Sequence, residues 1–130
     1  IAIPDGLVAP ALLDCAAKDL ATISTELRDL VARTKSGKLR PAEFTEQTFT
    51  LSNLGSFPVT QFTAIVTPPQ VAILATGRSE ARAVVRDGAV VARTMLTATL
   101  SADHRAVDGA LVAAFLGDLK SRLEAPAGLA

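Results

Sequence analysis

The stretch LTATLSADHRAVDG, residues 96–109, contains the transition on which the fold depends. Polar and apolar residues alternate from its start to His104, which predicts a β-strand with His104 at its end. Asp108 follows at the position of an N-cap, before a helix whose apolar stripe continues to Leu123. A strand that leads through a charged turn into an amphipathic helix is typical of α/β folds.

A second long helix is predicted in the first half of the chain. Apolar residues recur at helical spacing from Leu20 to Thr34, with Asp19 at the N-cap position and Gly37 just beyond the end. Its polar face is expected to be solvated, so its charges are assigned no function. Pro41 is expected to open one further helical turn.

The remaining apolar segments predict strands. Val71 to Thr76 is short and continuously apolar, which is typical of a central strand covered on both faces. Asp87-Gly88 between two β-branched runs predicts a hairpin. The other predicted strands are residues 1–3, 7–13, 48–52 and 63–67. We therefore expect an α/β two-layer sandwich, in which the helices lie on one face of a mixed sheet.

Composition excludes several classes of protein. The chain has 130 residues, a net charge of zero and 49% hydrophobic residues, which fits one folded domain and provides no basic surface for nucleic acid or an anionic membrane. One cysteine excludes a disulfide framework and a cysteine-rich zinc site. The 31 uncharged positions from Gln47 to Gly77 are interrupted by Pro, Gly, Asn and Gln, which favours buried strands over a membrane span. The strand-like start without Met suggests part of a longer chain.

His104 is the candidate for acid–base chemistry, because it is the one histidine and lies between Asp103 and Arg105. The simpler alternative is a core histidine that is hydrogen-bonded to a neighbour. Asp108 is explained by helix capping, which is compatible with a second role beside His104. Cys15 fits a small buried residue better than a nucleophile. Neither a Gly-x-Ser-x-Gly elbow nor a phosphate-binding glycine loop is present in the sequence, and the ligands for a metal site are lacking.

Several motifs together resemble the dihydrolipoamide acyltransferases, which are the core components of 2-oxo acid dehydrogenase complexes. The sequence DHRAVDG at residues 103–109 is similar to that family's DHRxxDG signature, and TFTLSNLG at residues 48–55 is similar to its TFTISNLG. Residues 62–74, with their Pro-Pro-Gln, also fit the pattern. The resemblance covers nearly the whole chain, but only the C-terminal half of the family's catalytic domain. Thr67 and residues 57–59 depart from the family pattern, away from the matched catalytic positions.

The resemblance implies a chloramphenicol acetyltransferase-like fold, with residues 1–130 as the C-terminal part of one catalytic domain. It implies transfer of an acyl group from S-acyl-dihydrolipoamide to coenzyme A. His104 matches the family's catalytic base and Ser52 the serine that stabilises the oxyanion, although Ser52 is an ordinary strand residue on sequence grounds. Asp108 matches an acidic position to which we assign an orienting role. The Ser-Asn-Leu-Gly sequence at residues 52–55 favours acetyl over succinyl groups.

The resemblance also implies partners. Family members form trimers with the active site in a channel between subunits, and the trimers build cubic or dodecahedral cores. Residues 47–77 would then form channel wall and buried sheet. The expected partners are further copies of the chain, a lipoyl domain that carries lipoamide and the other components of the complex, with neither a metal nor a membrane. The expected compartment is the bacterial cytoplasm, or the mitochondrial matrix in a eukaryote. The alternatives are a non-catalytic scaffold, branched-chain acyl specificity, and an acetyltransferase of the chloramphenicol-inactivating type.

Overall fold

A computed structural model of the chain describes residues 1–128, which divide into two compact units. The first unit comprises Ile1–Thr48 and the C-terminal segment from Phe115, and the second comprises Phe49–Ala114. Helix α3 (Gly109–Glu124) is divided between the two units, because the second unit ends at Ala114 within it. Within residues 1–128, none of the helices is long and apolar enough to cross a membrane.

The first unit is built around helix α1. Its elements are β1 (Ala2–Ile3), β2 (Gly6–Leu7), the 3₁₀ turn η1 (Cys15–Ala17), α1 (Leu20–Lys35), α2 (Ala42–Thr45) and the 3₁₀ turn η2 (Pro126–Gly128). The Asp19 carboxylate accepts a hydrogen bond from the Thr22 N–H at 2.7 Å, which confirms the predicted cap. Gly37 ends the helix with a φ of 69°, a left-handed conformation that glycine adopts without strain. The short helix after Pro41 is also confirmed.

The predicted strand over residues 7–13 is wrong beyond Leu7. β1 and β2 form a two-residue antiparallel pair, and the chain then continues without strand pairing to η1. Pro10 has no N–H for a ladder, and the Ala11 N–H donates instead to the Glu43 carbonyl at 2.7 Å. An apolar run does not distinguish a strand from an irregular segment that packs against a helix. Residues 63–67 likewise contain no assigned strand.

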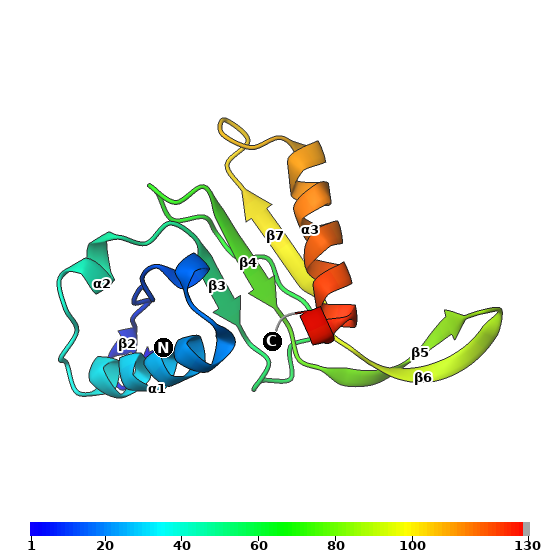
Figure 1. The fold of residues 1–130 in the computed structure, drawn as a ribbon, viewed down its shortest axis with the longest axis horizontal. Helices are drawn as coiled ribbons and strands as arrows, with labels where there is room; N and C mark the ends of the chain where they lie inside the picture. The colour runs from blue at the N-terminus through cyan, green and yellow to red at the C-terminus, as the bar shows by residue number, and fades with distance from the viewer. Residues whose placement is uncertain (129–130) are drawn as a thin grey trace. The chain divides into compact units, whose positions relative to one another are not determined.

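The second unit contains a three-stranded mixed sheet (Figure 1), which confirms the predicted α/β class and sheet type. Its strands are β3 (Thr50–Asn53), β4 (Ala72–Thr76) and β7 (Ala98–Ala102), in the order β3-β4-β7. β3 is parallel to β4, and β7 is antiparallel to it. Ala72 to Ala75 are buried, as expected of a central strand. The uncharged segment thus supplies buried sheet, as predicted.

Strand register sorts the side chains of this sheet onto two faces. Ser52 lies opposite Ala75, and Ala75 lies opposite Thr99, so these three side chains share a face. The hydroxyl residues of that face are Thr50, Ser52, Thr99 and Ser101. Leu51 lies on the other face and is 62% exposed. Ser52 therefore lies on a polar face beside the buried central strand.

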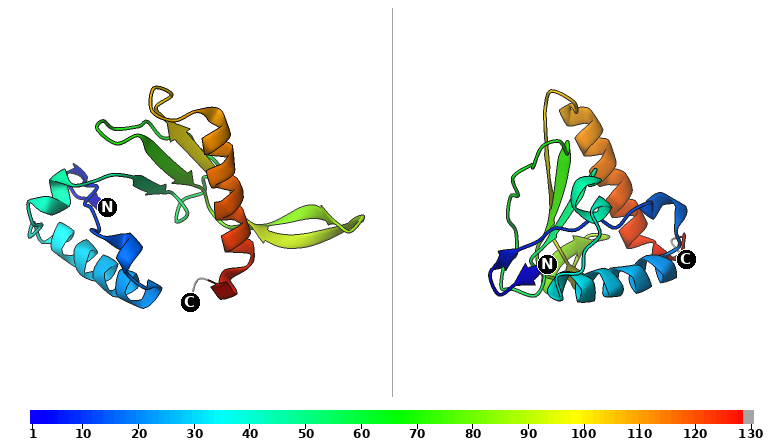
Figure 2. Two further views of the ribbon diagram at one scale, coloured as in Figure 1. Left: turned by 45° about the horizontal axis from the view of Figure 1, so that its top comes forward. Right: turned by 90° about the vertical axis from the view of Figure 1, so that its left-hand side faces the viewer.

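The predicted hairpin is confirmed by strands β5 (Glu80–Arg86) and β6 (Ala89–Met95). Asp87 and Gly88 form the two-residue turn, with φ values of 51° and 79°. Positive φ at both positions characterises the turn that suits the twist of paired strands. Figure 2 shows this hairpin extending away from the three-stranded sheet.

Gly77 leaves no room for a side chain at the end of β4. A Cβ at this position would lie 2.0 Å from the Thr60 carbonyl oxygen and 2.9 Å from the Val59 carbonyl oxygen. The neighbouring Arg78 N–H donates to that Val59 oxygen at 2.9 Å, which keeps the loop in place. The close approach of two backbones therefore depends on glycine.

We expect Gly77→Ala to lower the free energy of unfolding by about 3 kcal/mol, because the clashing atoms belong to the backbone and relieving the clash must move the loop. Denaturant titration of the full-length protein measures this change. Gly117→Ala is the matched control, since a Cβ at Gly117 meets nothing within 4 Å. It should be neutral or slightly stabilising, because alanine favours a helix. Equal stability of the two variants would contradict the prediction.

Candidate active site

The structure places His104 in the turn that follows β7, so its predicted position at the strand end is wrong. The Asp103 N–H donates to the Val71 carbonyl at 2.8 Å, and the chain turns directly afterwards. The N–H groups of Ala106 and Val107 both donate to the Asp103 carbonyl at 3.0 Å, which closes the turn. The His104 side chain is exposed, and it has no hydrogen bond within residues 1–128. The alternative of a core histidine that is hydrogen-bonded to a neighbour is therefore wrong for the described chain.

The residues on both sides of His104 are paired with each other. The Asp103 carboxylate accepts hydrogen bonds from the Arg105 backbone N–H at 3.0 Å and from its guanidinium at 2.7 Å. The bonds from the guanidinium, and then the one from the backbone N–H, lower the pKa of Asp103 to about 2. The charged Asp103 carboxylate therefore braces the turn that displays His104.

Asp108 caps helix α3, as predicted. Its Oδ1 accepts a hydrogen bond from the Leu111 N–H at 2.8 Å. Within the described part of the chain no hydrogen bond joins Asp108 to His104. By capping the helix, Asp108 fixes the end of the turn that begins at Asp103.

Ser52 lies near the end of β3 and is half-buried. The turn after it is held in two ways: the Leu54 N–H donates to the Thr76 carbonyl at 3.0 Å, and the Asn53 side chain accepts from the Gly55 N–H at 2.7 Å. The Ser52 hydroxyl itself has no hydrogen-bond partner in residues 1–128. The strand is fixed in position and the Ser52 hydroxyl is free to donate. This hydroxyl can therefore stabilise a negative charge that develops on a substrate.

The structure does not bring Ser52 and His104 together within one chain. Ser52 is level with Thr99 in the sheet, whereas His104 lies beyond the far end of β7. At about 3.3 Å per residue, the two positions are separated by roughly 15 Å along the strands, in addition to the width of the intervening strand. Hydrogen-bond reach is about 3 Å. The described structure therefore does not place the two residues in one site.

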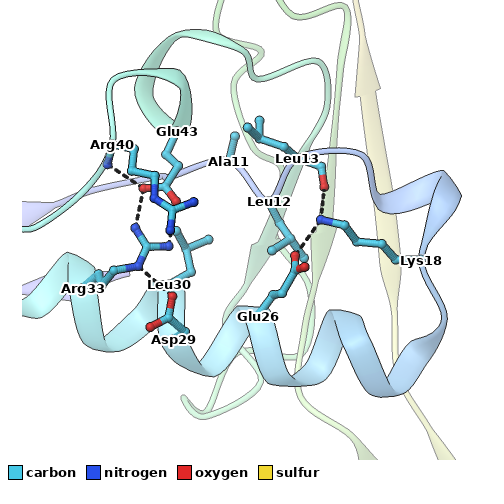
Figure 3. A pocket seen from close by; sticks show the side chains of 10 residues that line it. All are labelled: Ala11, Leu12, Leu13, Lys18, Glu26, Asp29, Leu30, Arg33, Arg40 and Glu43. Atoms are coloured by element: carbon cyan, nitrogen blue, oxygen red, sulfur yellow. Dashed lines mark hydrogen bonds and ion pairs between the residues drawn. The ribbon is translucent and has the colours of Figure 1, made fainter.

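The first unit contains a charged cavity of about 340 Å³ (Figure 3). Arg33 on α1 forms a bidentate ion pair with Glu43 on α2, both contacts at 2.6 Å, and a further one with Asp29 at 2.7 Å. The hydrogen bonds from Arg33, more than the Arg40 N–H, lower the pKa of Glu43 to about 2. The Arg33 side chain is only 21% exposed and its partner Glu43 only 6%, so the expectation that the charges of α1 are solvated is wrong for Arg33. The pair joins two helices and is structural.

The sequence raised two other kinds of chemistry, a nucleophilic thiol at Cys15 and a metal site. Cys15 is exposed, not buried as expected, and its thiol donates to the Leu12 carbonyl at 3.2 Å. No group of three or more potential metal ligands is found in residues 1–128.

The sequence matches the family described as 2-oxoacid dehydrogenases acyltransferase (catalytic domain) over residues 1–130. A curated relative is the dihydrolipoyllysine-residue acetyltransferase component of the pyruvate dehydrogenase complex of Rickettsia felis. The two are 42% identical over 127 residues, which is 98% of this chain and 31% of the relative. The chain thus spans about a third of the length of that curated relative.

Solved structures confirm the fold. The dihydrolipoamide acetyltransferase of Azotobacter vinelandii is 35% identical and superimposes with a TM-score of 0.88, over 93% of this chain and 50% of that one. It was determined to investigate the roles of one serine, one histidine and one asparagine in catalysis. The cubic core of a pyruvate dehydrogenase multienzyme complex is also 35% identical, with a TM-score of 0.89 over 95% of this chain and 51% of that one.

Proposed function

Because the chain belongs to the 2-oxoacid dehydrogenase acyltransferase family, we propose that residues 1–130 form the C-terminal part of one catalytic domain. This domain transfers an acetyl group from S-acetyl-dihydrolipoamide to coenzyme A. The acetyl group is favoured over a branched-chain group because the Rickettsia relative is named an acetyltransferase of the pyruvate dehydrogenase complex. Its working compartment is the bacterial cytoplasm, or the mitochondrial matrix in a eukaryotic source.

One observation carries the assignment of the site residues. In the Azotobacter enzyme, the serine under investigation precedes the histidine by 52 positions, and the asparagine follows that histidine by four. Ser52, His104 and Asp108 have the same spacing in this chain. This chain has aspartate where that enzyme has asparagine, and either residue can cap a helix. The spacing supports Ser52 and His104 as the catalytic pair and Asp108 as a residue that orients the His104 turn.

The chemistry follows from the weakness of a thiol as a nucleophile. A thiol has a pKa of about 8.5, so only a few per cent is ionised at neutral pH. The neutral imidazole of His104 takes the proton of the coenzyme A thiol as its sulfur attacks the thioester carbonyl carbon. The carbonyl electron pair moves to oxygen, and the Ser52 hydroxyl donates a hydrogen bond to this oxyanion. When the carbonyl re-forms, the bond to the dihydrolipoamide sulfur breaks, and the imidazolium returns the proton to that thiolate.

This mechanism needs an assembly of several chains. The distance between Ser52 and His104 within one chain supports a site that takes the two residues from different subunits, as in a trimer. The similarity to a cubic core supports higher assembly of such trimers. The further partners are a lipoyl domain, which delivers the acyl group, and the other enzymes of the complex.

The assay is transfer of an acyl group from S-acyl-dihydrolipoamide to coenzyme A, measured on the assembled full-length protein. We expect acetyl transfer at a rate well above that of isobutyryl transfer. A preference for isobutyryl would replace the acetyl assignment by branched-chain specificity. A correctly assembled core that transfers neither group would support the scaffold alternative and contradict the proposed activity.

A further inference from the structure

One side-chain hydrogen bond connects the strand of Ser52 to the buried Gln70, in the segment that precedes β4. The Thr50 hydroxyl donates to the Gln70 Oε1 across twenty residues of sequence. Gln70 is 9% exposed, which makes it one of the few buried polar residues of the second unit. A buried amide oxygen that loses its donor is costly, so this contact strongly favours one position of Thr50.

The strand that this bond holds is short. β3 has four residues, and within the described residues it pairs only with β4. That pairing is parallel, which is the weaker kind of ladder. Thr50 and Ser52 are two residues apart, so their side chains lie on the same face of β3. A shift of Thr50 along or away from β4 would therefore move the Ser52 hydroxyl with it.

At the other end of this hydrogen bond, Gln70 lies next to the residue that fixes the start of the His104 turn. Gln70 directly precedes Val71, whose carbonyl accepts the Asp103 N–H at 2.8 Å. Asp103 is the residue before His104. The segment at residues 70–71 thus holds the start of the Ser52 strand through a side chain and the start of the His104 turn through its backbone.

We propose that Thr50 and Gln70 are positioning residues for acyl transfer, which hold the Ser52 hydroxyl where the oxyanion forms. The inference rests on the proposed function of Ser52. Neither side chain is required to touch the substrate. Their contribution is to keep a donor on a weakly paired edge strand within the narrow range of positions in which it stabilises the transition state.

The test uses the assembled full-length protein and the acetyl-transfer assay. Thr50→Val removes the hydroxyl at nearly constant volume, and we expect kcat to fall about 10-fold with KM for coenzyme A unchanged, since a misplaced group loses transition-state stabilisation. Thr50→Ser keeps the hydroxyl and should recover most of this loss. Thr48→Val makes the same chemical change at an exposed position before β3 and should stay within about twofold of wild type. If Thr50→Val folds poorly, Gln70→Met takes its place in the test. It removes the acceptor of the same hydrogen bond and should cause the same loss of kcat.

A double-mutant cycle separates positioning from general stability. In a Ser52→Ala background, Thr50→Val should cost less than about twofold, because the hydroxyl that it positions is already absent. The same 10-fold loss in both backgrounds, or equal activity of the Val and Ser variants at position 50, would overturn the inference while leaving the proposed function intact. A Ser52→Ala variant with normal kcat would instead refute the assigned role of Ser52, and the inference with it. Amide exchange of residues 50–53 should also be faster in Thr50→Val than in Thr48→Val.

Discussion

Replacing His104 with alanine should lower kcat for acetyl transfer by about 1,000-fold or more, because general base catalysis typically contributes 10²- to 10⁴-fold and no second imidazole exists in the chain. The loss should not be caused by misfolding. The His104 side chain is exposed and has no hydrogen bond within residues 1–128, and the turn is closed by the backbone and carboxylate of Asp103. The kinetic constants and the size of the assembly are therefore measured on the same preparation.

His104→Gln serves as a second variant, because it keeps a polar side chain without a group that titrates near neutral pH. It should be as inactive as the alanine variant, and the pH dependence of kcat/KM should lose the limb due to imidazole. Near-normal transfer by either variant would contradict the mechanism. A collapse of the assembly in both variants would show that His104 is structural instead.

Replacing Ser52 with alanine should lower kcat about 100-fold with little change in KM, because the removed hydrogen bond forms fully only when charge develops on the thioester oxygen. Ser52 is half-buried on β3, and its hydroxyl is not used by any other residue of the described chain. The fold should therefore tolerate the change. A rise in KM with kcat unchanged would make Ser52 a binding residue.

Ser56→Ala is the matched control, since Ser56 is an exposed serine in the turn that follows and makes no hydrogen bond within residues 1–128. It should keep its activity within about twofold of wild type.

The two variants of low activity, Ser52→Ala and His104→Ala, can also be mixed. If serine and histidine come from different subunits, random co-assembly of Ser52→Ala with His104→Ala should restore about a quarter of wild-type activity, since each interface combines residues of two chains. If both residues came from one chain, the mixture would stay inactive.

Local sequence chemistry predicted much of this fold. The caps at Asp19 and Asp108 and the Asp87-Gly88 turn are confirmed, because each depends on groups within three residues of one another. The central strand β4 is confirmed because an apolar run of that length in a mixed sheet is buried on both faces. Composition and periodicity did not single out Ser52. Its candidacy came from the TFTLSNLG motif, since a serine on a strand has no local signature of function.

Contacts between distant residues decided the rest. Whether residues 7–13 would form a strand depended on a partner strand, and whether the charges of α1 would be solvated depended on Glu43, ten residues from Arg33. The position of His104 in a turn depended on Val71, whose carbonyl accepts the Asp103 N–H just after β7. By itself, the sequence determined the identity and spacing of Ser52, His104 and Asp108. Only the strand register showed that Ser52 and His104 lie at opposite ends of the sheet, because pairing between segments distant in the chain has no local signal.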